Sequence, residues 1–511
     1  MADTFNPKIG KTVLETLTSG MYDDARFIFR EYIQNAADQV DQAVELIVLK
    51  EKSEGKIEIT IDANNKQIII LDNATGVSEK EVLRFLGDVA NSQKDSVKQK
   101  GFRGIGRLGG LGYCDKLIFE TSSYGEPIKS KMTLDAKLLK KIIENRNDNS
   151  DAAAALSIIT KIEKTTADNN EHFFRVILEN VFNEKLLDNE RVTEYLSMVT
   201  PVPFSSSFTF SEQIKGLLKS RNLIPDEYNV EINGKTLFKG YKNTFIEEDN
   251  SLSKLIGVDV VDIRNDEQEI IATCWYGYRE FSNTVIYAPA KKNEHNPNPE
   301  RGIRIRTKNI GIGDESTCKK FFDAERTNLR FIGEIHTISD GFVPNARRDY
   351  FTENNTLKQF EKNGKVIFTQ ENLENILAQT ASKLHNRLDE IEKYKTELVR
   401  FQKMKGSFDN EATETYHLSR LKELYEKALR AKQVVEKIEN KSKTSSKIKI
   451  LYESIANNID TTIPSLDNNV SQVSKYDPPK FEKLNENQKD VVLEIFEILE
   501  ESLDFDLSEL I

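Results

Sequence analysis

Cysteine and histidine are scarce in this chain of 511 residues, which contains three cysteines and five histidines. Cys114, Cys274 and Cys318 stand too far apart in the sequence for a zinc knuckle and do not suggest a disulfide framework. The histidines are scattered singly, a distribution that favours structural roles over metal binding. We therefore expect neither a disulfide scaffold nor a zinc site, and we expect a reducing, cytoplasmic location.

Long apolar runs are missing as well. No stretch approaches the roughly 20 apolar residues that a membrane span requires, and the first residues lack the apolar core of a secretory signal. Charged residues are plentiful but sum to −11, which disfavours non-specific binding to nucleic acid unless a local basic patch overrides it. We expect a globular protein without a membrane partner, and the length predicts about three or four domains.

Residues 24–49 form a strong helical pattern near the amino terminus. Glu31, Asn35 and Asp38 follow one another at i, i+4 and i+7, which places them within about 60° of each other on one face of a helix. The same stretch also carries a stripe of apolar residues with helical spacing. Its members are Phe29, Ile33, Ala36, Val40, Ala43 and Ile47.

The polar stripe of this helix suits the chemistry of a magnesium-bound phosphate. A hard divalent cation that keeps most of its waters needs only one or two protein oxygens, and the Asn35 carbonyl can supply one without adding negative charge. Glu31 is then free to orient or deprotonate an attacking water. The alternative is an ordinary solvated helix face with acidic residues.

A hairpin follows the helix, with strands predicted at residues 56–61 and 67–71. The second strand ends at Asp72, and Gly76 comes four residues later. A carboxylate at a strand end can accept a hydrogen bond from an exocyclic amine, while glycine lets the chain turn closely past the ring. The alternative is simple turn chemistry, in which Asp-Asn before Gly is common.

Glycine is concentrated between residues 100 and 112. Backbone N–H groups in this segment can approach phosphate oxygens, and a helix that starts there adds its positive end. The preceding residues 90–99 are polar and lysine-bearing, so they could fold over a triphosphate as a lid. A flexible glycine-rich loop is the alternative. The residues expected to contact nucleotide here are Lys94, Gly101, Phe102, Arg103, Gly104, Ile105 and Gly106.

These three features, in this order, resemble the GHKL ATPases, the family of gyrase, heat-shock chaperones, histidine kinases and MutL. The resemblance implies an α+β fold with a Bergerat-type α/β sandwich, in which a mixed sheet packs against helices. It implies ATP and Mg²⁺ as cofactors, with Glu31 catalytic, Asn35 as the metal ligand, and a nucleotide site that includes Asn35, Asp38, Asp72 and Gly76. Ala74 departs from the family pattern, which has Gly there, so we expect an altered nucleotide affinity.

The resemblance is closest to the ninety-kilodalton heat-shock chaperone class, which includes HtpG. Residues 21–22, Met-Tyr, lead into residues 29–31, Phe-Arg-Glu, in a similar way. Residues 371–511 do not resemble the usual carboxy-terminal dimerisation domain of that class. The similarity to the class therefore covers about residues 1–370.

A second match to that class lies at residues 343–350. In the middle domain of such chaperones, an Asn is followed three residues later by an Arg that reaches the γ-phosphate, and Asn345 and Arg348 stand at this spacing. A planar guanidinium suits charge spread over phosphoryl oxygens. Arg348 is thus the expected catalytic arginine, with Arg347 as the fallback. The alternative is a surface salt bridge with a nearby acidic residue.

Composition shifts divide the chain. A linker is indicated by the Pro- and Ser-rich residues 201–207, and residues 302–314 alternate apolar with basic residues, which predicts a strand with one buried and one positive face. Apolar spacings of three and four between residues 384 and 438 predict helices. The expected parts are an ATP-binding domain in 1–201, an α/β middle domain carrying Arg348 in 202–370, a helical hairpin or coiled coil in 371–460, and a linker with an acidic helix in 461–511.

The resemblance implies an ATP-hydrolysing protein of chaperone-like build that closes a lid and a dimer clamp on binding ATP. The implied partners are a second copy of the chain and either a protein client or a dedicated protein partner. The alternative is an ATP-gated clamp that acts on DNA or within a DNA-associated complex, as MORC and MutL proteins do. A histidine kinase comes third, because no phosphoacceptor-helix pattern flanks the ATPase part.

Overall fold

The computed structural model describes residues 9–18, 20, 24–87, 106–145, 147–247, 251–279, 298–371, 373–457 and 459–466. These residues form two compact units, one of residues up to Ser382 together with Ser446–Ile455, and one of Lys383–Ser445 together with the residues from Ala456 onward. Several predicted features lie outside the described residues: the Met21-Tyr22 pair, residues 90–99 with Lys94, the nucleotide contacts Gly101, Phe102, Arg103, Gly104 and Ile105, and the carboxy-terminal acidic helix.

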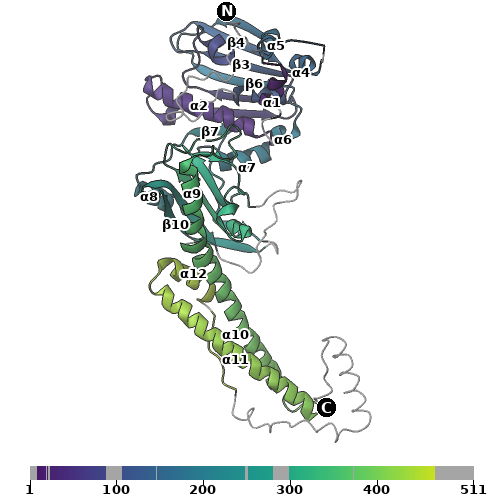
Figure 1. Cartoon of the computed structure of the whole chain (residues 1–511), viewed down its shortest axis with the longest axis vertical. Coiled ribbons are helices and arrows are strands. Elements are labelled where there is room, and N and C mark those ends of the chain that lie inside the picture. The colour runs from purple at the N-terminus through teal and green to yellow at the C-terminus, as the bar shows by residue number, and fades with distance from the viewer. Residues whose placement is uncertain are drawn as a thin grey trace, which may run out of the picture. The chain divides into compact units, whose positions relative to one another are not determined.

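The first unit contains an eight-stranded mixed sheet in the order β5-β4-β3-β6-β2-β1-β7-β8 (Figure 1). Neighbouring strands are antiparallel except for the parallel pair β1 and β7. Because β7 and β8 belong to this sheet, it continues past residue 201, where the sequence placed the end of the first domain. The strands are β1 (Lys56–Asp62), β2 (Gln67–Asp72), β3 (Lys116–Ser122), β4 (Ile128–Asp135), β5 (Thr160–Thr166), β6 (Phe173–Glu179), β7 (Asn229–Ile232) and β8 (Lys235–Thr236).

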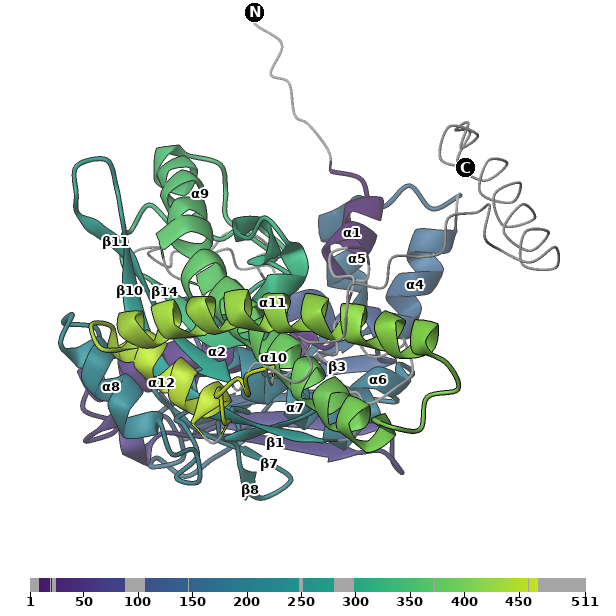
Figure 2. The ribbon, with the colours of Figure 1, turned by 90° about the horizontal axis from the view of Figure 1, so that it is seen from below.

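Helices pack on one face of this sheet. Side chains alternate along β1, so Ile57, Ile59 and Ile61 are buried, and they share one apolar core with the helices. Helices α1, α4 and α5 group together beside the strands in Figure 1 and Figure 2. The predicted α+β sandwich is confirmed. The helices are α1 (Thr12–Thr18), α2 (Phe27–Glu45), α3 (Val82–Gly87), α4 (Ala136–Glu144), α5 (Ala152–Ile159), α6 (Glu184–Leu187) and α7 (Asn189–Val199).

Helix α2 is shorter than the pattern at residues 24–49 predicted. Its apolar stripe is buried as expected from Phe29 to Ala43. Ile47, however, lies beyond the end of the helix with a φ of 59° and is exposed. The stripe therefore ends one turn earlier, because the chain leaves the helix at Leu46.

A second sheet in the same unit has six strands in the order β13-β12-β14-β11-β10-β9. Helix α8 (Ser211–Lys219) packs on the face that carries Trp275, whereas α9 (Asn355–Val366) and α12 (Ser446–Ala456) pack on the face that carries Tyr276. Both faces are therefore buried. The strands are β9 (Thr244–Ile246), β10 (Leu252–Arg264), β11 (Ile270–Arg279), β12 (Gly302–Thr307), β13 (Ile310–Ile312) and β14 (Phe331–Thr337).

The basic strip predicted at residues 302–314 is not a solvated positive face. The alternation itself is present, since Ile303 and Ile305 enter the core on one face. Arg304 and Arg306 on the other face are also buried, and they pair with Glu315 and Glu334. Packing on both faces of the sheet removes this strip from solvent.

The second unit is built on α10 (Gln379–Met404) and α11 (Glu411–Ser442). Ring contacts between Tyr394 and Tyr425, and from Phe401 through Phe408 to His417, show that the two helices run antiparallel. The predicted helical region is thus confirmed. None of the helices in the described part of the chain is long and apolar enough to cross a membrane.

Candidate active site

Three polar residues of α2 stand one helical turn apart and define the length of the site. Glu31, Asn35 and Gln39 occupy positions i, i+4 and i+8, so they span about 12 Å along the helix. The first contacts the start of the glycine-rich segment, and the last contacts the loop that follows Asp72. The helix therefore connects the two features that the sequence assigned to phosphate and to base.

Glu31 lies against the backbone of the glycine-rich segment. It is only 8% exposed, and a Cβ placed on Gly106 would lie 2.4 Å from its Oε2. Gly106 begins a 3₁₀ helix, Gly106–Gly112, which Tyr32 fixes by donating to the carbonyl of Arg107 at 3.0 Å and accepting from Gly110 N–H at 3.2 Å. Glycine at position 106 thus lets the backbone lie directly against the Glu31 carboxylate, which a larger residue would displace.

Arg348 contacts the same carboxylate from the loop that follows β14 of the six-stranded sheet. Its Nε lies 3.0 Å from Glu31 Oε1, and both side chains are nearly buried. Arg348 sits in a turn with a φ of 56°, in which its N–H donates to the carbonyl of Asn345. Arg347 is exposed. The structure therefore pairs Arg348 with the buried Glu31.

Glu31 keeps acceptor capacity despite this pairing. Arg30 Nη2 also lies 4.0 Å from its Oε1, yet Oε1 accepts no aligned hydrogen bond from any described residue. A buried acceptor without a hydrogen bond costs about 1–3 kcal/mol unless something else satisfies it. An oxygen of this kind suits a water molecule that is held for attack.

Arg30 and Gln34, two neighbours of Glu31 on α2, were not predicted from the sequence. Arg30 is buried, and it donates from Nη2 to the carbonyl of Arg347 at 3.1 Å and from Nη1 to that of Gly311 at 3.4 Å. Gln34 is 1% exposed, and neither of its amide atoms has a partner among the described residues. Their i, i+4 spacing was the available signal, because it forms a second polar stripe beside Glu31.

Asp72 lies at the other end of the site. It is buried at the end of β2, where Ala74 N–H donates to its Oδ1 at 3.1 Å. Burial raises the pKa of Asp72 to about 7. A buried carboxylate with spare acceptor capacity suits an amine donor from a ligand.

The loop after Asp72 is held closely by three elements. Thr75 Oγ1 donates to Gln39 Oε1 at 2.6 Å, Val77 N–H donates to Thr121 Oγ1 at 2.8 Å, and His172 Nδ1 lies 2.7 Å from the carbonyl of Ala74. Ala74, the departure from the family pattern, is fully buried in the core. The loop is therefore fixed to α2 and to the ends of β3 and β6.

Gly76 is the point of closest approach in this loop. Its φ is 63°, and an added Cβ would lie 1.8 Å from the carbonyl oxygen of Ser122. Both the backbone conformation and the space thus require glycine. At Gly76 the loop therefore passes directly over the end of β3 and the start of β6.

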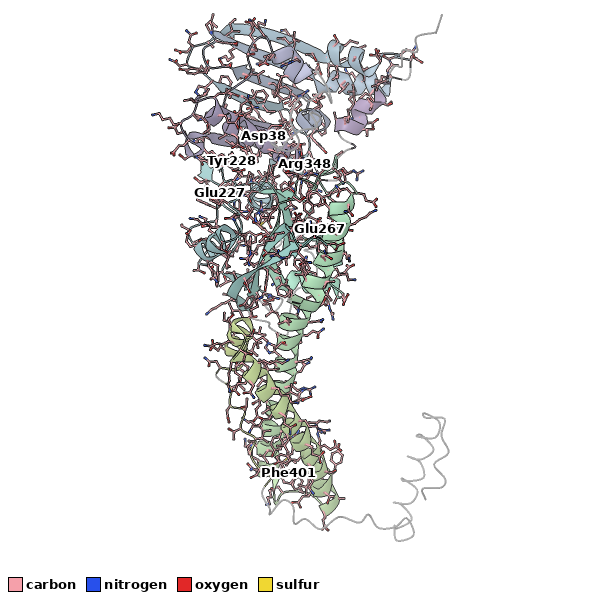
Figure 3. All side chains as sticks on the ribbon, turned by 60° about the vertical axis from the view of Figure 1, so that its left-hand side comes forward. Asp38, Glu227, Tyr228, Glu267, Arg348 and Phe401 are labelled. Carbon is pink, nitrogen blue, oxygen red and sulfur yellow. The ribbon has the colours of Figure 1, made fainter. Side chains whose placement is uncertain are left out.

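Asn35 and Asp38 complete the predicted stripe. Asn35 is partly exposed and Asp38 is buried. Burial, a hydrogen bond to Asp41 and nearby carboxylates, Asp38 among them, raise the pKa of Tyr228 (Asp38 and Tyr228 are labelled in Figure 3). The role of Asp38 in nucleotide binding stays a prediction.

Within the described residues no cluster of three or more His, Cys, Asp or Glu side chains could hold a metal ion. The partly exposed Asn35, one turn from Glu31, fits instead the sparse protein ligation that Mg²⁺ takes beside phosphates. Its assignment as the metal ligand stays a prediction.

Comparison with known proteins agrees with this geometry. Residues 27–169 match the family model of histidine kinase-, DNA gyrase B-, and HSP90-like ATPases. They form a GHKL ATPase domain. The match contains Glu31, Asn35, Asp72 and the glycine-rich segment, and the predicted family is confirmed.

Curated relatives extend the similarity beyond the GHKL domain. The chaperone protein HtpG of Rickettsia typhi is 22% identical over 376 residues, and that of Rickettsia canadensis is 23% identical over 376 residues. Each alignment covers 70% of this chain and 54% of the relative, so the chain spans about half the length of these relatives. HtpG of Psychromonas ingrahamii is 30% identical over 145 residues, which cover 24% of this chain and 22% of the relative.

The first prediction concerns the loop of the GHKL domain at Gly76. Gly76→Ala should lower the free energy of unfolding by about 2–5 kcal/mol, because it adds both left-handed strain and a collision with backbone. Gly125→Ala is the matched control, since Gly125 also has a positive φ but open space around it; it should cost about 1–2 kcal/mol. Denaturant unfolding measures both, and equal losses would contradict the packing at Ser122.

The second prediction uses the raised pKa of Asp72. An ionised carboxylate accepts a hydrogen bond from an adenine amine more strongly than the neutral acid does, and the neutral acid predominates in the free protein below about pH 7. Adenosine, which has no phosphates to titrate, should therefore bind about tenfold more tightly at about pH 8 than at about pH 6. Calorimetry across this range measures the effect, and a flat profile would remove Asp72 from the site.

Asp72→Asn is the control for this profile. It should bind adenosine weakly and without pH dependence. It should also raise the free energy of unfolding above about pH 7. The Asp72 carboxyl has a higher pKa in the native protein than in the unfolded one, so its burial makes the wild-type protein less stable as the pH rises from 3.8 to about 7. Asparagine removes this loss.

Proposed function

We propose that this chain is a Mg²⁺-dependent ATPase whose active site combines the GHKL domain with the loop that carries Arg348. The observation that carries the proposal is the nearly buried contact between Glu31 and Arg348, adjacent to Gly106. A general base, a guanidinium and a glycine backbone at one point are the components that hydrolysis of a phosphoanhydride requires. The base end of the nucleotide would occupy the region of Asp72 and Gly76.

In this proposal Arg348 has two partners at different stages. Without nucleotide it neutralises Glu31. When ATP is bound, the γ-phosphate competes for the guanidinium, because a phosphate offers more negative charge and a bidentate match to its planar donors. Transfer of Arg348 to the phosphate would leave the Glu31 carboxylate free to accept a proton from water.

Asn35 would hold Mg²⁺ through its side-chain oxygen. The ion supplies neutralisation of charge on the phosphate oxygens when it is bound. Lys94 and the residues from Gly101 to Ile105 would cover the phosphates, as the sequence predicts. Exclusion of water by such a cover would strengthen the interactions of Arg348 and Glu31 within the site.

We propose further that ATP drives a chaperone-like cycle with a lid and a dimer clamp. The relatives that are named chaperone protein HtpG support this choice. The partners would be a second copy of the chain and a protein client or dedicated protein partner in the cytoplasm. A clamp that acts on DNA remains the competing outcome of the experiment below.

The third prediction separates Arg348 from its neighbour. Arg348→Ala should lower kcat by about 10²- to 10³-fold with little change in ADP affinity, because its donor acts only on charge that develops at the γ-phosphate. Arg348→Lys should restore little, since a point charge cannot replace the planar fork. Steady-state turnover and ADP calorimetry measure both quantities. Arg347→Ala is the matched control, and a defect confined to Arg347 would show that the other arginine is catalytic.

The fourth prediction tests the cycle. Glu31→Ala should bind ATP but hydrolyse it about 10²-fold or more slowly, and the trapped nucleotide should populate a dimer in light scattering. With ATP it should suppress aggregation of a heat-denatured test protein. Retention of duplex DNA instead would favour the DNA clamp, and a trapped protein that stays monomeric would contradict both forms of clamp.

A further inference from the structure

A buried carboxylate lies inside the second sheet, away from Glu31. Glu334 on β14 is 1% exposed, and its oxygens meet donors from several strands. Burial alone would raise the pKa of Glu334, but the charges of Arg306 and Lys239 hold this pKa well below its ordinary value. Its neighbours are Lys239 Nζ at 2.8 Å, His336 Nε2 at 3.1 Å, Tyr241 Oη at 3.2 Å, Trp275 Nε1 at 3.3 Å, and Arg306 Nε.

Arg306 connects the Glu334 carboxylate to helix α7, which packs on the eight-stranded sheet. While its Nε pairs with Glu334, Nη2 donates to the carbonyl of Met198 at 2.8 Å and Nη1 to that of Thr200 at 3.0 Å. These carbonyls belong to the carboxy-terminal end of α7, where helix carbonyls lack partners within the helix. A single guanidinium thus caps α7 and anchors it to β12.

The chain that follows Arg306 leads directly to the active site. Nη1 also donates to the carbonyl of Asn309 at 2.8 Å, which fixes the turn into β13. On β13 the carbonyl of Gly311 accepts a hydrogen bond from Arg30. Two residues later, just after β13, the N–H of Gly313 donates to the carbonyl of Arg348 at 2.9 Å.

β13 also lies directly on α7. A Cβ on Gly311 would meet Val199 Cα at 3.1 Å. The contact leaves little freedom for β13 to shift along the helix, because the Cα and the β-branched side chain of Val199 both lie directly against Gly311. The end of α7 therefore supports the strand that holds the Arg348 turn.

We propose that Arg306, held by Glu334, is a positioning residue that sets the distance between the Arg348 turn and Glu31. The inference rests on the proposed ATPase function. Arg306 touches neither substrate nor Glu31; it acts through β13. An error of about 1 Å in such a support can cost up to about 10²-fold in rate. The proposed base site at Asp72 and Gly76 lies at the other end of the active site and should be unaffected.

The fifth prediction compares two arginines on one strand. Arg306→Lys keeps the charge but cannot reach Glu334 and the α7 carbonyls together, so kcat should fall about tenfold or more while ADP affinity stays within about twofold. Arg304→Lys is the matched control. Arg304 is also buried on β12, but it pairs with Glu315 and the carbonyl of Pro299, so its replacement should lower stability without lowering kcat.

A double variant distinguishes positioning from general damage. If Arg306 acts through Arg348, adding Arg306→Lys to Arg348→Ala should lower kcat no further than Arg348→Ala alone. Additive losses, or equal losses in the two lysine variants, would overturn the inference. If Arg306→Lys binds no ADP, Glu334→Gln takes its place with the same expected results. Absence of ATP hydrolysis by the wild-type chain would instead overturn the proposed function.

Discussion

The contact between Glu31 and Arg348 is the interaction on which the rest of the site depends. Two opposite charges are held almost out of water, and either one left alone there would be strongly unfavourable. Arg348 therefore requires an anionic partner, so any ligand that takes it from Glu31 must itself be anionic.

Local patterns were sufficient for the parts of the site that lie within single elements. The spacing of Glu31, Asn35 and Asp38 on one helix, and the position of Asp72 at a strand end, follow from helix and strand periodicity. Long-range contacts were not accessible in this way. That Arg30 reaches the carbonyls of Gly311 and Arg347 depends on residues some 280 to 320 positions away, which no periodicity encodes.

The second sheet illustrates the same limit. The alternation at Arg304 and Arg306 was read correctly as a strand, but alternation indicates only that two faces differ in chemistry. Whether the basic face meets water depends on what covers it, here α7 and the carboxylates of Glu315 and Glu334. Likewise the parallel pairing of β7 with β1 could be seen only once both strands were placed in one sheet.

The path of the chain through α12 has a consequence for how the helical hairpin can vary. The chain leaves the first unit after Ser382 and returns to it at Ser446, where Lys447 bonds to Asp259 and Tyr276, and Leu451 enters the core of the second sheet. The hairpin is therefore an insertion with both ends anchored in the same fold. Residues could be added or removed in matched turns of its two helices while the ATPase fold keeps its complete core, so the length of the hairpin can diverge independently of the catalytic apparatus.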